Sequence, residues 1–129
     1  VLGGGIVDVK TMNIITMAYL GDAVYELYVR EFLINKGIVY ADDLQKEEVN
    51  YVSAKSQANF LKKLIERDVL NDLELDIVKR GRNYKRNYHP KNTDIITYKM
   101  STGFEAMIGY LYISDRKRLE EILKFIEVE

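Results

Sequence analysis

The stretch Met17-Ala-Tyr-Leu-Gly-Asp-Ala-Val-Tyr-Glu-Leu-Tyr-Val29 is apolar around almost its whole circumference when it is wound as a helix. It carries only two charges, Asp22 and Glu26. Asn13 is a suitable N-cap, and Gly37 is a suitable end signal. The sequence therefore predicts a long buried helix from Asn13 to about Lys36, with an acid set into its apolar surface.

A second apolar stretch, Gly103-Phe-Glu-Ala-Met-Ile-Gly-Tyr-Leu-Tyr-Ile113, has Glu105 as its only charge. A buried carboxylate is costly unless it is paired, hydrogen-bonded or bound to a metal ion. We therefore expect Asp22 and Glu105 to be buried acids with a partner, which is either a cation such as Lys55 or a metal. Glu26, one turn beyond Asp22, is a second ligand or a surface acid, and the surface role is favoured. Small residues flank both acids, which lets a second backbone come close: Gly21, Ala23, Ala106 and Gly109.

The rest of the chain also has helical spacing and lacks sustained alternation, so the fold class is predicted to be all-α. Asp42 or Asp43 is expected to cap a helix, and the region to Arg67 is expected to hold two helices that meet near residues 51–53. Further helices are expected over 71–80, over 94–113 with a break near Ser101, and over 115–126. Residues 81–92 are predicted to form a loop.

The composition excludes several kinds of protein. The chain has 129 residues, no cysteine and one histidine, so it has neither disulfides nor a multi-histidine metal site. Carboxylates are left as metal ligands, and they favour Mg²⁺ or Mn²⁺. No apolar run approaches the roughly 20 residues of a membrane span, and a cytoplasmic location is expected. Residues 1–12, with three consecutive glycines, are predicted to be a flexible lead-in, and residues 13–129 a single domain.

Positive charge is concentrated in one segment. Although the net charge is −1, six cations and no acid lie between residues 79 and 91, which leaves −7 for the remainder. Tyrosines and the histidine are interleaved with these cations, a pattern suited to nucleic-acid phosphates, while a solvated charge run is the alternative. The candidate RNA-binding residues are Lys79, Arg80, Arg82, Lys85, Arg86 and Lys91.

The two acidic motifs resemble those of a known family. Leu20-Gly-Asp-Ala-Val-Tyr-Glu26 is similar to the ribonuclease III signature F-L-G-D-[AS]-[VI]-L, and Phe104-Glu-Ala-Met-Ile-Gly109 is similar to its second motif, D-x-x-E-A-x-[IV]-G. Further blocks resemble the bacterial Mini-ribonuclease III subfamily, which lacks the double-stranded-RNA-binding domain. These blocks are Val52-Ser-Ala-Lys55, Arg80-Gly-Arg-Asn83, Pro90-Lys-Asn-Thr-Asp94 and Tyr98-Lys-Met-Ser-Thr102.

The resemblance implies an all-helical, homodimeric endonuclease domain that cuts double-stranded RNA with Mg²⁺, for which Mn²⁺ is a substitute. It implies that Asp22 and Glu105 hold the metal and are catalytic, that the products carry a 5′-phosphate, and that the substrate is a 23S ribosomal RNA precursor. Ribonuclease III has two more acids, at positions held here by Ala18 and Thr102. Candidates for supporting contacts around the metal are Glu26, Lys55, Ser101 and Thr102.

Two alternatives to an enzyme are open at this point. One is a catalytically silent RNA-binding factor in ribosome assembly, against which the retention of both Asp22 and Glu105 argues. The other is a helical protein-interaction module, against which the basic segment argues. A metal-dependent cleavage assay discriminates the first, and salt-dependent RNA binding discriminates the second.

Overall fold

The computed structural model describes residues 8–85, 91 and 93–128, which fold into six α-helices. In chain order these are α1 (Ile14–Asn35), α2 (Ala41–Val52), α3 (Ala54–Glu66), α4 (Asp72–Asn83), α5 (Ile95–Ser114) and α6 (Arg116–Val128). No strand occurs within these described ranges, so the all-α prediction is confirmed. Among these six helices, none combines the length and the apolar character that crossing a membrane requires.

Side-chain caps fix five of the helix starts, and one of them is Asp115, which accepts from the backbone N–H of Arg118 at the start of α6 at 3.1 Å. The Asn13 side chain accepts from the backbone N–H groups of Ile15 and Thr16, and Ser53 and Asp94 cap α3 and α5 in the same way. Asn71 and Glu74 form a reciprocal capping box at the start of α4. The predicted starts at Asn13, Asn71 and Asp94 are therefore confirmed, as is the boundary of α2 and α3 at Ser53.

Three predicted boundaries are wrong. Tyr40 is the residue before α2, so Asp42 and Asp43 lie in the first turn of the helix and do not cap it. In the first turn, their negative charges interact favourably with the helix dipole. Helix α4 continues through Gly81 to Asn83, and α5 runs without a break at Ser101. Gly81 stays helical because α4 and α5 touch there: a Cβ on Gly81 would lie 2.7 Å from the Cα of Gly103. At this position glycine serves close packing and does not end the helix.

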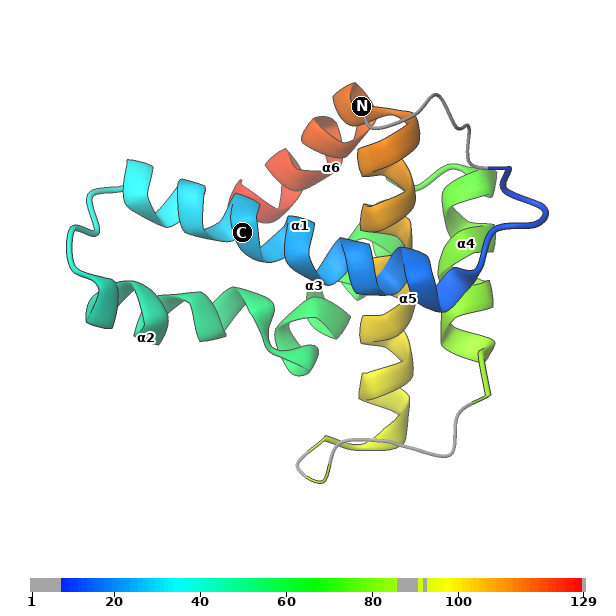
Figure 1. The fold of residues 1–129 in the computed structure, drawn as a ribbon, viewed down its shortest axis with the longest axis horizontal. Helices are drawn as coiled ribbons and strands as arrows, with labels where there is room; N and C mark the ends of the chain where they lie inside the picture. The colour runs from blue at the N-terminus through cyan, green and yellow to red at the C-terminus, as the bar shows by residue number, and fades with distance from the viewer. Residues whose placement is uncertain (1–7, 86–90, 92, 129) are drawn as a thin grey trace.

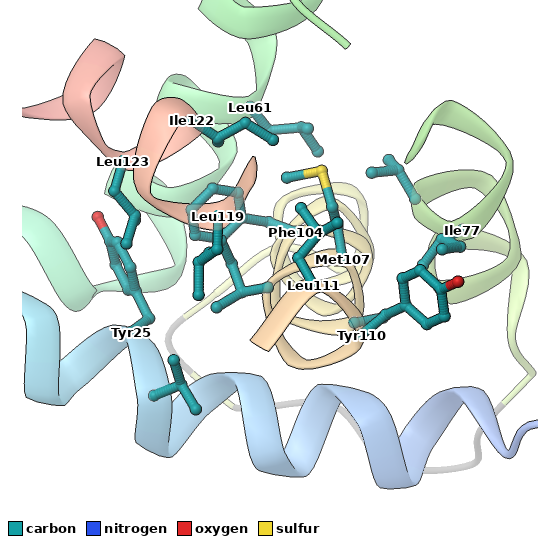
Figure 2. Close-up of a cluster of buried hydrophobic side chains, with 14 of the residues drawn as sticks. Tyr25, Leu61, Ile77, Phe104, Met107, Tyr110, Leu111, Leu119, Ile122 and Leu123 are labelled. Atoms are coloured by element: carbon teal, nitrogen blue, oxygen red, sulfur yellow. The ribbon is translucent and has the colours of Figure 1, made fainter. Parts of the chain in front are cut away.

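Helix α5 lies at the centre of the molecule, with α1 running across it and α4 alongside it (Figure 1). Figure 2 shows three of its side chains pointing in different directions: Phe104 toward the side of Tyr25, Met107 toward Leu61 and Tyr110 toward Ile77. Phe104 is fully buried and meets the Tyr25 ring edge-on, with 5.0 Å between ring centroids. Tyr25 is thus a core residue, whereas Tyr19, on the same helix, is 83% exposed.

The segment before α1 is attached to α4 by Arg80. The guanidinium of Arg80 donates to the backbone carbonyls of Val9, at 2.6 Å, and Met12, at 3.2 Å. Val9 and Met12 also pack partly buried against the core. Residues 8–12 are therefore part of the folded unit, although residues 1–12 were expected to be a flexible lead-in; residues 1–7 lie outside the described residues.

Candidate active site

Two glycines allow α1 and α5 to cross at backbone contact. A Cβ on Gly21 would overlap the carbonyl oxygen of Glu105, and a Cβ on Gly109 would overlap the carbonyl oxygen of Met17. Any larger residue would force the helices apart. The crossing brings Asp22, the residue after Gly21, beside Glu105, which confirms that the small residues beside the acids admit a second backbone.

The Glu105 carboxyl group lies in a site that disfavours its charged form. Burial and then the negative charge of Asp22 raise the pKa of Glu105 to about 8, and a hydrogen bond between the two carboxyl groups acts in the same direction. A hydrogen bond from Gln57 opposes them. In this bond, Nε2 of Gln57 donates to Oε2 of Glu105 at 3.3 Å. Asp22 therefore lies close enough for its charge to act on the Glu105 carboxyl group.

No cation neutralises this pair within the part of the chain that the structure describes: neither Asp22 nor Glu105 forms an ion pair with a lysine or arginine there. The contrast is Glu74, which is buried and is paired with the Arg118 guanidinium at 2.7 Å. Among the described residues, the structure therefore does not show the alternative in which Asp22 and Glu105 pair with a lysine or arginine.

The two acids suit a hard cation. Magnesium is commonly held by one or two carboxylates and completes its shell with water. Asp22 and Glu105 offer this donor set, and no third acid joins them: over residues 8–85, 91 and 93–128, no cluster of three or more His, Cys, Asp or Glu residues could hold a metal ion. The residues present therefore fit a divalent ion with a small protein ligand set.

Asp22 departs from expectation, because it is exposed and not buried. Gly21 is the residue pressed against α5, and a step of 100° around the helix carries Asp22 to the rim of that contact. Glu105 is half-buried. The pair Asp22 and Glu105, here called the dyad, thus lies at the edge of the α1–α5 interface, where Asp22 is open to solvent.

Glu26 belongs to a chain of ion pairs between α1 and α2. Its carboxylate lies 3.7 Å from the guanidinium of Arg30, which also contacts Glu48 at 3.0 Å. Partial burial and then the negative charge of Asp22 raise the pKa of Glu26. Lys55 lies exposed at the start of α3, and the structure shows no contact that would pair it with either catalytic candidate.

The two hydroxyl candidates have different partners. Thr102 Oγ1 donates to the carbonyl of Tyr98, one turn earlier in α5, at 3.0 Å. Ser101 Oγ donates to Oε1 of Gln57 at 2.9 Å, so it reaches Glu105 only through that amide. Sequence reasoning missed Gln57. The available signal was a polar residue at a core position of an amphipathic helix, since Gln57 shares its face with Leu61 and Leu64.

The basic segment divides into two parts. Lys79, Arg82 and Lys85 are exposed at the end of α4 and just beyond it, and Lys91 is exposed as well. Arg80 is partly buried and its guanidinium is held by the two carbonyls before α1. Arg86, Tyr88 and His89 lie outside the described residues. RNA contact by these residues stays a prediction, and Arg80 also has a structural role.

Comparison with known proteins identifies the family of this chain. Residues 16–116 match the ribonuclease III domain model, which covers most of the chain and both acids of the dyad. The chain belongs to the ribonuclease III family, and the expected class, a double-strand-specific endoribonuclease, is confirmed at the level of that family.

The similar proteins define the group within that family. A Mini-ribonuclease 3 from Brevibacillus brevis is 48% identical and aligns over 91% of this chain and 87% of its own length. One from Streptococcus pneumoniae is 44% identical over 92% of this chain and 94% of its own length. The crystal structure of a Fusobacterium nucleatum protein superposes with a TM-score of 0.78 at 32% identity, covering 94% of this chain and 93% of the other. The chain therefore falls in the Mini-ribonuclease 3 group.

Proposed function

We propose that this protein hydrolyses phosphodiester bonds of double-stranded RNA in a Mg²⁺-dependent reaction carried by Asp22 and Glu105. The observation that supports it most directly is the crossing at Gly21 and Gly109, which sets these two acids side by side with no ion-pair partner among the described residues. When Mg²⁺ is bound, it polarises the phosphate and helps to generate the attacking hydroxide. Asp22 and Glu105 would hold it, and the expected products carry a 5′-phosphate and a 3′-hydroxyl.

The basic segment supports RNA as the substrate. Lys79, Arg82 and Lys85 present exposed positive charge at the end of α4, which packs beside α5 and thus belongs to the same unit as the dyad. A-form RNA is recognised largely through phosphate and 2′-hydroxyl contacts, which cations at a helix end suit. We propose that these side chains bind the phosphates of the strand being cut.

We also propose that the protein works as a homodimer. Tyr19, Leu27 and Ile34 on α1 are 83%, 52% and 54% exposed, and at 100° per residue they fall within an arc of roughly 80°. An exposed stripe of this kind, apolar except for Arg30, fits a second copy of the same stripe across a twofold axis. Two dyads related by that axis would cut the two strands of a duplex.

The natural substrate that we propose is the 23S ribosomal RNA precursor, and the proposed location of the reaction is the cytoplasm.

The deciding experiment incubates the purified chain with long double-stranded RNA, with Mg²⁺ or with a chelator. Shortening of the RNA with Mg²⁺ alone, together with 5′-phosphate ends, is the expected result. Binding without cleavage at any Mg²⁺ concentration would indicate instead the silent RNA-binding factor.

A further inference from the structure

The side-chain amide of Gln57 is a buried polar group that joins three elements. It is 1% exposed and lies in α3, yet it contacts the last residue of α2 and two residues of α5. Its Nε2 donates to the Val52 carbonyl at 3.1 Å and to Glu105 Oε2 at 3.3 Å, while its Oε1 accepts from Ser101 Oγ at 2.9 Å. Every polar atom of this amide is engaged.

The partners fix which way the amide faces. The Val52 carbonyl can only accept, so the Gln57 atom beside it must be the NH₂ group. Oε1 then faces the Ser101 hydroxyl, which donates to it, and the second N–H is directed at Glu105. The orientation of the Gln57 amide is thus fixed, and its Nε2 donates a hydrogen bond to the Glu105 carboxylate.

A neutral hydrogen-bond donor can hold the Glu105 carboxylate without cancelling its negative charge, which a cation cannot do. A lysine or arginine on Glu105 would neutralise the carboxylate, as the Arg118 guanidinium does for Glu74, and would repel a divalent ion. The Gln57 amide satisfies one lone pair of Oε2 and adds no positive charge. It stabilises the ionised Glu105 beside Asp22 and leaves its other lone pairs for a metal ion.

We propose that Gln57 is a positioning residue for the metal site: supported by Ser101, it holds the Glu105 carboxylate next to Asp22 in the geometry that a divalent cation needs. This inference rests on the proposed function. Outer partners of metal-binding carboxylates typically change metal affinity or activity by about 10- to 100-fold when they are removed. In this chain, Ala18 and Thr102 leave few acids at the site, so the orientation of Glu105 carries more of the affinity.

The test measures binding of Mn²⁺ alone to the full chain, without RNA, by calorimetry or by the electron paramagnetic resonance signal of free Mn²⁺. Gln57→Leu keeps the volume and removes the donor, and Gln45→Leu makes the same change on the exposed surface of α2 as a control. We expect Gln57→Leu to bind Mn²⁺ at least about tenfold more weakly than the parent, and Gln45→Leu to match the parent. Affinities are compared at a temperature where each variant is folded.

Ser101→Ala tests the same network without changing Gln57. We expect an intermediate loss of Mn²⁺ affinity, and the double variant Gln57→Leu/Ser101→Ala to bind about as weakly as Gln57→Leu, because Ser101 acts through the amide. A purely structural role would lower the melting temperature of Gln57→Leu in chelator and leave the Mn²⁺ affinity of the folded protein unchanged.

Parental Mn²⁺ affinity in folded Gln57→Leu overturns the inference, while Mg²⁺-dependent cleavage by the parent still supports the proposed function. If Gln57→Leu does not fold, Ser101→Ala decides: weakened Mn²⁺ binding supports the inference, and parental affinity overturns it. A parent chain that neither binds Mn²⁺ nor cleaves RNA overturns the proposed function and this inference together.

Discussion

The α-carbon of Gly21 packs directly against the backbone carbonyl of Glu105. The contact joins the middle of α1 to the middle of α5, and the reciprocal contact of Gly109 with the carbonyl of Met17 closes it from the other side. The active-site spacing is therefore set by two backbones and not by long side chains. A methyl group at either glycine would overlap backbone atoms, which cannot rotate away.

Gly21→Ala should destabilise the protein and inactivate it. Overpacking of a well-packed interface typically costs 1–3 kcal/mol, and backbone overlap places this change at about 3 kcal/mol or more. For a domain of this size that is a fall of about 10 °C in melting temperature, measurable by calorimetry. Ala41→Ser, an exposed change at the start of α2, is the control. A Gly21→Ala protein with the parental melting temperature would contradict the crossing described here.

Asp22→Asn and Glu105→Gln should each lower cleavage of double-stranded RNA by about a thousandfold or more. Both keep side-chain size and remove a metal-binding charge, and a bound ion contributes several kcal/mol to a phosphodiester transition state. Melting temperature in chelator should hold or rise, because each change relieves the repulsion between two adjacent acids. Cleavage rate and melting temperature are measured on the same samples. Folded Asp22→Asn with near-parental cleavage would remove Asp22 from the mechanism.

The stability of the metal-free protein should fall between about pH 4.5 and pH 8 through Glu105. Its pKa is raised from 4.5 to about 8 in the fold, so over this range the folded state binds more protons than the unfolded state. Stability therefore decreases as pH rises. Since one pH unit is worth about 1.4 kcal/mol, the total is at most a few kcal/mol. Melting temperatures in chelator are compared between the parent and Glu105→Gln, and the difference between the two should narrow below about pH 5. A difference that is constant with pH would show that the Glu105 carboxyl group is not perturbed.

Replacing Lys79, Arg82 and Lys85 with alanine should weaken RNA binding without unfolding the protein, because these side chains are exposed. Each lost phosphate contact should reduce the magnitude of the log–log salt slope by about one. Arg80→Ala is the informative comparison: it should lower the melting temperature as well, because it frees the carbonyls of Val9 and Met12. Binding measured in chelator at several salt concentrations checks this. Unchanged affinity and slope would show the charge run to be solvated.

Tyr19→Arg combined with Leu27→Arg should convert the proposed dimer to a monomer. Both residues lie on the exposed apolar stripe of α1, and two cations facing their symmetry mates would repel. Val39→Arg is the matched control, since Val39 is 81% exposed in the connection between α1 and α2. Sedimentation at micromolar concentration gives the mass. A monomeric parent under these conditions would contradict the proposed dimer.

The sequence by itself determined the helices and the two acids. Capping side chains at Asn13, Asn71 and Asp94 act within a few residues of chain, so their signals are local and readable. Asp22 and Glu105 were found because each interrupts an apolar stretch, and the flanking glycines correctly indicated a close approach of backbones. Resemblance to ribonuclease III then supplied what the residues alone left open.

Only the tertiary structure decided how the acids are surrounded. Burial of Asp22 was expected, yet it lies exposed, because the rim of a helix crossing depends on the angle at which α1 meets α5. Gly81 was expected to end a helix, yet it packs on Gly103 inside one. Gln57 was missed because its partners Ser101 and Glu105 lie 44 and 48 residues away along the chain. Contacts over such separations leave no spacing pattern in the sequence, whereas capping and amphipathicity act within one or two turns.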